Sequence, residues 1–215
     1  MTLSGGTLSC GRYGGNPVKQ YFLIPLIAAM AWGAPAAAQT VESAYTDFNL
    51  KKCRHTPGKA QEDYGEWRCG GYANIPVWMT AGDQRIMVSY GSRAKQELAA
   101  TQTLAAFNGE GNRIEWRMET DSNGKKRPFA TIMRWSTTTT GENGEPVHGE
   151  VLVVTRLSPG GVCHVGYVDG RANPDANAIA REIADRHARN FRCGTDKRIV
   201  LGNKGPGFSR PYDDE

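Results

Sequence analysis

Residues 149–169 read GEVLVVTRLSPGGVCHVGYVD and combine two β-rich runs with one turn signal. The run 149–157 is dense in valine and leucine, and the run 162–168 is its shorter partner. Between them stands Ser158-Pro159-Gly160-Gly161, whose proline and glycines favour a turn. Two such runs joined by a short turn predict an antiparallel pair of strands.

The residues before this pair extend it into a meander. Residues 113–119 and 127–137 alternate between apolar and polar side chains, and Trp116 and Trp135 stand at apolar positions. The turn sequence DSNG, residues 121–124, separates the two runs. Four consecutive strands with mostly short connections predict an antiparallel β-sheet meander in the second half of the chain.

A helix is expected over residues 174–191. Asn173 is a typical N-cap, Pro174 suits the first helical position, and Asp175 lies near the positive end of the helix dipole. Apolar residues recur at the spacing of one helical face. They are Ala176, Ile179, Ala180, Ile183 and Ala184. This stripe predicts a C-terminal helix packed on one face of the sheet, which makes the fold class α+β.

The first half of the chain predicts less regular structure. Residues 66–72 and 84–90 are expected to be strands, and residues 53–64 a polar loop. Residues 75–80 contain Pro76, which has no N–H group to donate. They are therefore expected at a sheet edge or in an irregular segment.

A second helix is predicted over residues 93–107, because Ser92 can cap it and Asn108-Gly109 can end it. The complete prediction is a sheet of five to seven strands in a single α+β domain, residues 39–203. Residues 204–215, KGPGFSRPYDDE, are expected to be a disordered tail.

The N-terminus, residues 1–38, has the features of a secretory signal peptide. Arg12 and Lys19 supply positive charge, and residues 21–32, YFLIPLIAAMAW, form an apolar run before three small alanines. Cleavage is expected after Ala38. The alternative is a retained anchor, but the apolar run is short for a bilayer span of roughly 20 residues. We expect no stable membrane anchor after cleavage.

Charge argues against nucleic acid as a partner. Loss of residues 1–38 removes two of the 26 basic residues and leaves 24 of them against 22 acidic ones. Proteins that bind nucleic acid normally show a clustered basic excess.

The cysteines predict two disulfides. Cys10 leaves with the signal peptide, and Cys53, Cys69, Cys163 and Cys193 remain. An even number of cysteines in an exported chain indicates disulfides. A metal site would need close ligand pairs such as C-x₂-C, and the sequence has none. No metal or cofactor site is therefore predicted.

The pairing follows from the lengths of two neighbouring elements. The strand after Cys163 climbs roughly 23 Å, and the helix before Cys193 returns over roughly 26 Å. A helix packed antiparallel to its strand then brings Cys193 beside Cys163. This favours Cys163–Cys193 and leaves Cys53–Cys69 as the second pair.

Two tryptophans and two arginines are candidates for a binding surface. Trp116 and Trp135 lie on paired strands and can stack across them, flanked by Arg117 and Arg134. Such a surface suits a sugar or a partner protein. The alternative role of both indoles is in the core.

Histidines are few, and none belongs to a known catalytic motif. His55 and His148 fall in predicted loops, and His187 falls near the end of the predicted helix. Cys163 and His164 are neighbours on a strand, so their side chains are expected on opposite faces and are not expected to act together. The nucleophile motif G-x-S-x-G is not present.

These observations favour a periplasmic or secreted, non-enzymatic binding or interaction module, with a protein or a cell-envelope glycan as partner. One alternative is a cell-envelope hydrolase whose site is built from loops, with His55 or His148 beside an acid. Another is a structural component of an envelope assembly.

Two runs resemble segments of known proteins. They are residues 66–91, EWRCGGYANIPVWMTAGDQRIMVSYG, and residues 163–185, CHVGYVDGRANPDANAIAREIAD. Both are similar to small uncharacterised exported proteins of alphaproteobacterial type, a family with no known activity. The resemblance implies an exported protein and assigns no site residue.

Overall fold

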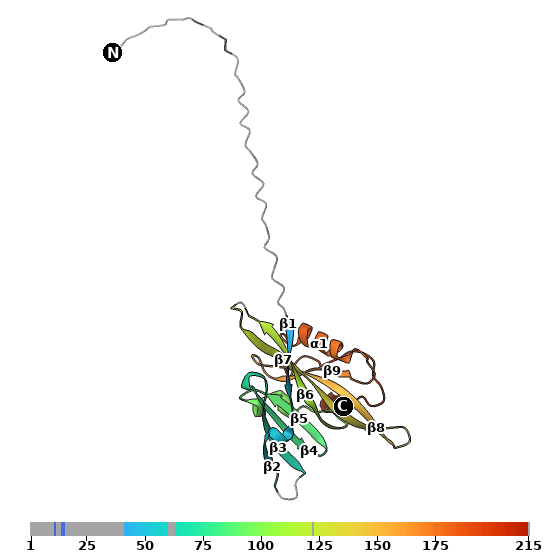
Figure 1. Ribbon diagram of the computed structural model, residues 1–215. Coiled ribbons are helices and arrows are strands. Elements are labelled where there is room, and N and C mark those ends of the chain that lie inside the picture. Colours follow the sequence, from blue (N-terminus) through green and yellow to red (C-terminus); the bar gives the residue numbers. More distant parts are fainter. Residues whose placement is uncertain (1–10, 12–13, 16–40, 60–62, 122, 215) are drawn as a thin grey trace, which may run out of the picture. The chain divides into compact units, whose positions relative to one another are not determined.

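The computed structural model describes residues 11, 14–15, 41–59, 63–121 and 123–214 (Figure 1). The chain divides into two units, residues 1–37 and residues 38–215, and the second holds every described strand and helix. The predicted signal peptide lies outside the described residues, apart from three glycines. Within the described ranges, no helix combines the length and apolarity needed to cross a bilayer.

The second unit contains two β-sheets, and nearly all strand pairs in them are antiparallel. In the described residues the larger sheet has six strands in the order β1-β6-β7-β8-β9-β10. They are β1 (Val41–Asp47), β6 (Phe107–Thr120), β7 (Lys126–Thr140), β8 (Pro146–Arg156), β9 (Cys163–Asp169) and β10 (Ile199–Val200). The smaller sheet has four strands: β2 (Arg54–Pro57), β3 (Tyr64–Gly70), β4 (Pro76–Gly82) and β5 (Arg85–Tyr90).

One α-helix and five short 3₁₀ turns complete the described elements. They are α1 (Ala176–His187), η1 (Leu50–Lys52), η2 (Tyr72–Asn74), η3 (Ala94–Gln96), η4 (Leu98–Thr101) and η5 (Tyr212–Asp214). Strands β6 to β9 form the predicted meander, and α1 packs on β7, β8 and β9. The α+β class and the meander are therefore confirmed.

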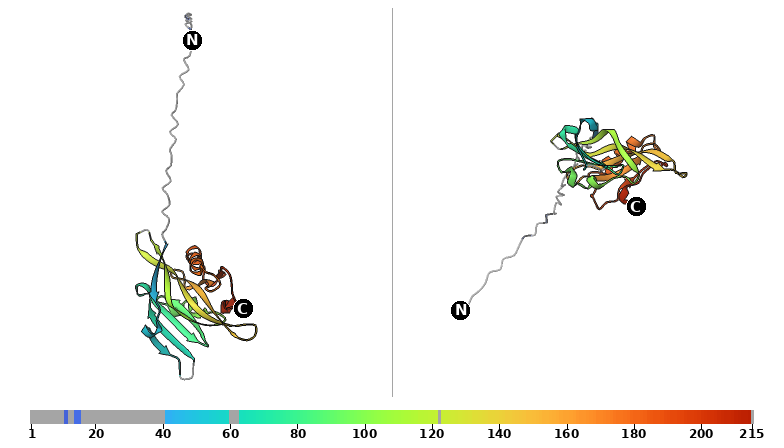
Figure 2. Two further views of the ribbon diagram at one scale, coloured as in Figure 1. Left: turned by 45° about the vertical axis from the view of Figure 1, so that its right-hand side comes forward. Right: turned by 90° about the horizontal axis from the view of Figure 1, so that it is seen from below.

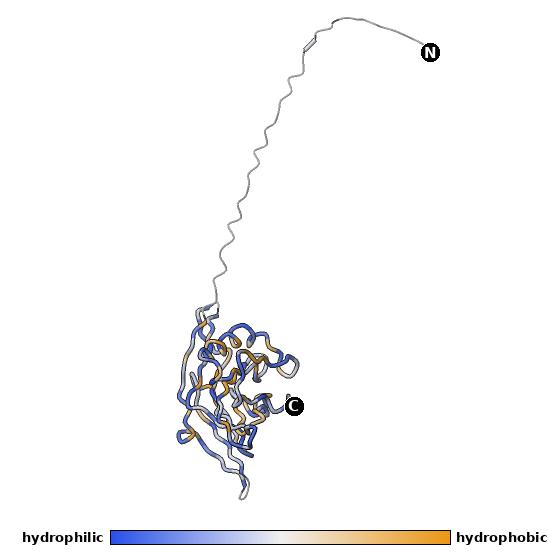
Figure 3. Tube along the Cα trace, turned by 90° about the vertical axis from the view of Figure 1, so that its right-hand side faces the viewer, coloured by the Kyte–Doolittle hydropathy of each residue, from blue (hydrophilic) through white to orange (hydrophobic). Residues whose placement is uncertain are grey.

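Three layers result, with the six-stranded sheet in the middle (Figure 2). The core between the two sheets includes Val88, Trp116 and Val153, all buried. The second core lies between the large sheet and α1, and Val165 and Ile183 are at its centre. Apolar segments accordingly run through the interior of the second unit, and many of its outer segments are hydrophilic (Figure 3).

The face of β6 that looks toward α1 carries a buried row of charged side chains. Glu115, Arg117 and Glu119 are each less than a tenth exposed. Arg117 binds the carboxylate of Asp185 through two nitrogens, at 2.9 and 2.6 Å. The ion pairs between strand and helix region are Arg117–Asp185, Arg181–Glu115 and Arg189–Glu119. Because each buried charge has a partner, the strand can keep a polar row beneath the helix.

The start of α1 differs from the prediction. The helix begins at Ala176, and Asp175 occupies the N-cap position without a side-chain cap. Asn173 has another role: its Nδ2 donates to the carbonyl oxygens of Asp169 (2.9 Å) and Asn203 (2.8 Å). It therefore anchors the segment after the helix to the end of β9.

The first half of the chain contains the main errors of the sequence prediction. The helix over residues 93–107 is wrong, because η3 and η4 occupy this region and β6 begins at Phe107. Strands β1 and β2 were not expected. Strand β4 is an interior strand, and it accommodates Pro76 at its first position.

The expected disordered tail, residues 204–215, is also corrected for residues 204–214, which pack against the large sheet. Thr137 Oγ1 donates to the carbonyl oxygen of Gly207 at 2.7 Å. A Cβ atom at Gly149 would collide with that same carbonyl, so β8 needs glycine there. Pro211 forms a β-bridge with Leu104. Backbone hydrogen bonds also hold the segment: the N–H of Ala105 donates to the carbonyl oxygen of Arg210 at 2.9 Å, and the N–H of Tyr212 donates to that of Thr103 at 3.0 Å.

Ser209→Ala should lower the free energy of unfolding by about 1–3 kcal/mol. Ser209 is buried, and its Oγ accepts a hydrogen bond from the backbone N–H of Ala106 at 2.9 Å. The substitution leaves that N–H without a partner. Urea unfolding of both proteins measures the difference, with the exposed Thr195→Ala as control. Equal midpoints for wild type and Ser209→Ala would argue against the packed segment.

Both predicted disulfides are present. Cys163 pairs with Cys193 across 30 residues, and Cys53 pairs with Cys69 across 16. The length argument that selected Cys163–Cys193 is confirmed. Two disulfides suggest that the protein resides in an oxidising, extracytoplasmic compartment.

Candidate functional site

A β-bulge in β9 places His164 and Tyr167 on the same face of the large sheet. Thr155 of β8 pairs with His164 and Val154 pairs with Gly166, so Val165 is an extra residue in β9. Residues three apart on a regular strand point to opposite faces, and one extra residue reverses this. As a result His164 Nδ1 lies 2.8 Å from the hydroxyl oxygen of Tyr167.

The imidazole of His164 is fully buried among aromatic rings. Its ring meets Trp135 edge-on at 5.5 Å between centroids, and Tyr167 in the same way at 5.6 Å. The backbone N–H of His164 donates to Gln102 Oε1 at 2.7 Å. The second ring nitrogen, Nε2, is buried and has no hydrogen-bond partner in the described part of the chain.

Burial lowers the pKa of His164 from 6.5 to about 3. Two charged groups add smaller effects: Arg198 lowers the pKa further, and Asp213 raises it. The imidazole is therefore neutral at the pH of most extracytoplasmic compartments. Nδ1 is engaged by Tyr167, and Nε2 can donate or accept according to the tautomer.

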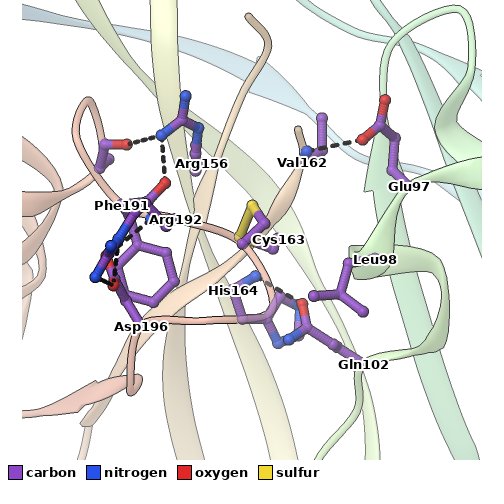
Figure 4. Close-up of a disulfide and its surroundings, with 12 residues drawn as sticks. Glu97, Leu98, Gln102, Arg156, Val162, Cys163, His164, Phe191, Arg192 and Asp196 are labelled. Atoms are coloured by element: carbon purple, nitrogen blue, oxygen red, sulfur yellow. Dashed lines mark hydrogen bonds and ion pairs between the residues drawn. A yellow bond between two sulfur atoms is a disulfide. The ribbon is translucent and has the colours of Figure 1, made fainter. Parts of the chain in front are cut away.

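His164 lines a cavity of about 520 Å³ beside the Cys163–Cys193 disulfide. In Figure 4, Leu98 and Gln102 lie on one side of Cys163 and His164, and Phe191 and Asp196 lie on the other. The remaining lining residues are Gly194, Lys197, Arg198 and Asp213. We call this space the disulfide cavity.

Charged residues surround the cavity, and its two carboxylates each bind an arginine. Asp196 accepts hydrogen bonds from the backbone N–H and the guanidinium of Arg192, both at 2.9 Å, which lower its pKa. Asp213 Oδ1 accepts from the guanidinium of Arg198 at 2.6 Å. Arg198 comes directly before β10, whose pairing with β9 fixes its backbone. The cavity thus combines apolar side chains and a neutral imidazole with two carboxylates and two cations, Lys197 and Arg198.

The structure does not bring the predicted tryptophan and arginine surface together. Trp116 and Trp135 are both buried between the two sheets, and they are not opposite each other, since Trp116 pairs with Thr131. Arg117 lies on the other face, beneath α1, and Arg134 binds Glu150 there. Neither indole is available as an exposed platform.

The other histidines lie apart from the disulfide cavity. His55 is exposed and stacks on Trp67 at 4.5 Å between centroids. His148 is exposed and lies 3.2 Å from Thr138 Oγ1, and His187 is exposed at the end of α1. The alternation of side chains along a regular strand does not predict the contact between His164 and Tyr167. Gly166 within the strand was the available signal, because glycine inside a strand often marks a bulge.

Two further findings bear on the chemistry of the chain. Within the described residues, no group of three or more His, Cys, Asp or Glu side chains is placed to hold a metal ion. No protein-family model, curated protein or solved structure matches this chain.

Proposed function

We propose that this protein is an extracytoplasmic, non-enzymatic binding module that holds a small ligand in the disulfide cavity. The observation that carries the proposal is the buried Nε2 atom of His164, for which the described residues supply no partner. Buried polar atoms in folded proteins are nearly always hydrogen-bonded. Because His164 is among the residues that line the disulfide cavity, its unpartnered atom supports a ligand bound there.

The size and walls of the cavity support the same proposal. Its volume of about 520 Å³ lies within the range usual for small-molecule sites. Leu98, Phe191 and the disulfide supply apolar surface. The polar side chains are those of Gln102, His164, Asp196, Lys197, Arg198 and Asp213. Such a lining is more polar than that of a typical small-molecule site and suits a ligand that combines an apolar body with a charged or polar group.

The protonation state of His164 favours binding over proton transfer. A catalytic acid or base works best when its pKa lies near the working pH. With a pKa of about 3, His164 carries no extra proton to give at neutral pH and is a weak base. It is suited to a fixed hydrogen bond with a ligand. The two disulfides and the signal-like N-terminus support the extracytoplasmic location.

Three probes with one ring and different charges test the proposal: benzoate, benzamide and benzylamine at millimolar concentration. In protein labelled with ¹⁵N in the histidine rings, at least one probe should shift the Nε2 signal of His164. The signals of the exposed His55, His148 and His187 serve as internal controls and should stay in place.

Two tryptophan variants locate the binding site. Leu98→Trp fills the cavity from a partly exposed wall position and should abolish the shift. Tyr64→Trp changes an exposed residue outside the cavity and should leave the shift intact. The proposal fails if all three probes leave His164 unmoved, or if the shift persists in Leu98→Trp.

A further inference from the structure

The disulfide cavity carries a cation fixed by the sheet and an anion held by the end of the chain. Arg198 has a side chain only 11 % exposed, and β10 follows it directly. Asp213, whose side chain is 55 % exposed, lies on the single turn η5 near the C-terminus. Of the two partners, Asp213 can leave the pair at lower cost, because its carboxylate is already half hydrated.

Both members of this pair lie close to His164. Arg198 and Asp213 line the same cavity as the imidazole, and their charges act on it in opposite directions. The other carboxylate of the cavity, Asp196, is held by Arg192 through two kinds of hydrogen bond. Asp213 is therefore the cavity carboxylate with the weaker hold on its position.

We infer that the disulfide cavity takes a small organic carboxylate, and that the ligand's carboxylate replaces Asp213 on the guanidinium of Arg198. This inference rests on the proposed function. A guanidinium binds a carboxylate in a two-pronged geometry that a ligand can reproduce as well as an aspartate can. The apolar body of the ligand then contacts Leu98 and Phe191, which line the same cavity as His164.

The chemistry of the cavity restricts the ligand further. Nε2 of His164 can bond a second polar group on the ligand in addition to its carboxylate, such as a hydroxyl or a carbonyl. The apolar wall favours an alkyl or aromatic body. A hydroxy acid or keto acid with such a body fits all three features.

The test measures competition between the carboxylate of the ligand and that of Asp213 for the guanidinium of Arg198. Asp213→Asn weakens the internal competitor and should tighten benzoate binding roughly 3- to 10-fold, measured by titration of the His164 signal. Arg198→Gln should weaken benzoate binding at least about tenfold. The control is Asp83→Asn, which breaks a similar ion pair between an exposed aspartate and Arg85 outside the cavity. It should leave the affinity for benzoate unchanged.

The outcomes separate this inference from the proposed function. If benzamide or benzylamine binds at His164 and benzoate does not, the cavity is a binding site but the carboxylate assignment is wrong. The same conclusion follows if benzoate binds wild type and Asp213→Asn equally well. If no probe reaches His164 in either protein, the proposed function itself fails. Asp213→Asn changes an exposed residue, so its melting temperature should stay near that of wild type.

Discussion

Replacing Cys163 and Cys193 together by alanine is expected to lower the free energy of unfolding by about 4 kcal/mol. The disulfide closes a segment with a sequence separation of 30 residues. In the chain-entropy description its main effect is to restrict the unfolded chain, and the effect grows with the length of the closed loop. Chemical unfolding of the oxidised wild type and of the double variant measures the loss.

The second disulfide provides the matched control for this prediction. Cys53 and Cys69 close a shorter segment, with a separation of 16, so their replacement by alanine should cost about 3 kcal/mol. Only the Cys163–Cys193 bridge lines the disulfide cavity, so only its removal should also weaken the response of His164 to benzoate. A Cys163→Ala/Cys193→Ala protein as stable as wild type would show that the helix region is held without the bridge.

The meander and its helix were predictable because their signals are local. Hairpin turns fall at residues 121–124 and 158–161, and the runs between them alternate or are continuously apolar. The pairing of Cys163 with Cys193 followed from two element lengths. These predictions needed no information about distant parts of the chain.

The errors share a different cause, which is contact between segments far apart in the sequence. Strand β1 owes its conformation to seven pairs with β6, starting at Val41↔Glu119. Residues 204–214 are held by hydrogen-bonding groups on strands that are distant in the sequence. One of these groups is the hydroxyl of Thr137, which lies 70 residues before Gly207. No local pattern encodes such contacts. Propensity is therefore overridden by tertiary pairing in these segments.

The prediction of an exposed tryptophan and arginine surface was wrong for a more specific reason. Trp116 and Trp135 were correctly assigned to one apolar face, but that face turned out to lie between two sheets. The alternation rule also hid the partnership of His164 with Tyr167, since it puts residues three apart on opposite faces. A single bulge at Val165 changed that outcome. Bulges are common beside functional sites, so a glycine such as Gly166 within a strand is worth testing as a bulge.

Acid should destabilise this protein through His164. The pKa of the imidazole is 6.5 without the fold and about 3 in the folded protein, where burial disfavours the charged ring. Between these values the unfolded chain binds a proton that the folded chain does not. Stability from this group is therefore complete above pH 6.5 and falls as the pH drops toward 3. From pH 7 to pH 4.5 the loss is about 2–3 kcal/mol, and it reaches roughly 4 kcal/mol near pH 3.

His164→Gln removes the titrating group, so its stability should fall less steeply with acid than that of wild type. Urea unfolding at several pH values between 7 and 4.5 gives both curves. Carboxylates in ion pairs contribute equally to the pH dependence of stability in both proteins. The difference between the two curves therefore gives the contribution of His164.

Tyr167→Phe separates the titration of the ring from the loss of its hydrogen bond. That variant removes the hydroxyl that contacts Nδ1 and should lower stability at every pH, but it keeps the imidazole and therefore the acid dependence. If wild type and His164→Gln instead lose stability in parallel, the imidazole must accept a proton in the folded state. It would then lie in contact with water or with an anion, and the argument for a neutral hydrogen-bonding group in the disulfide cavity would no longer hold.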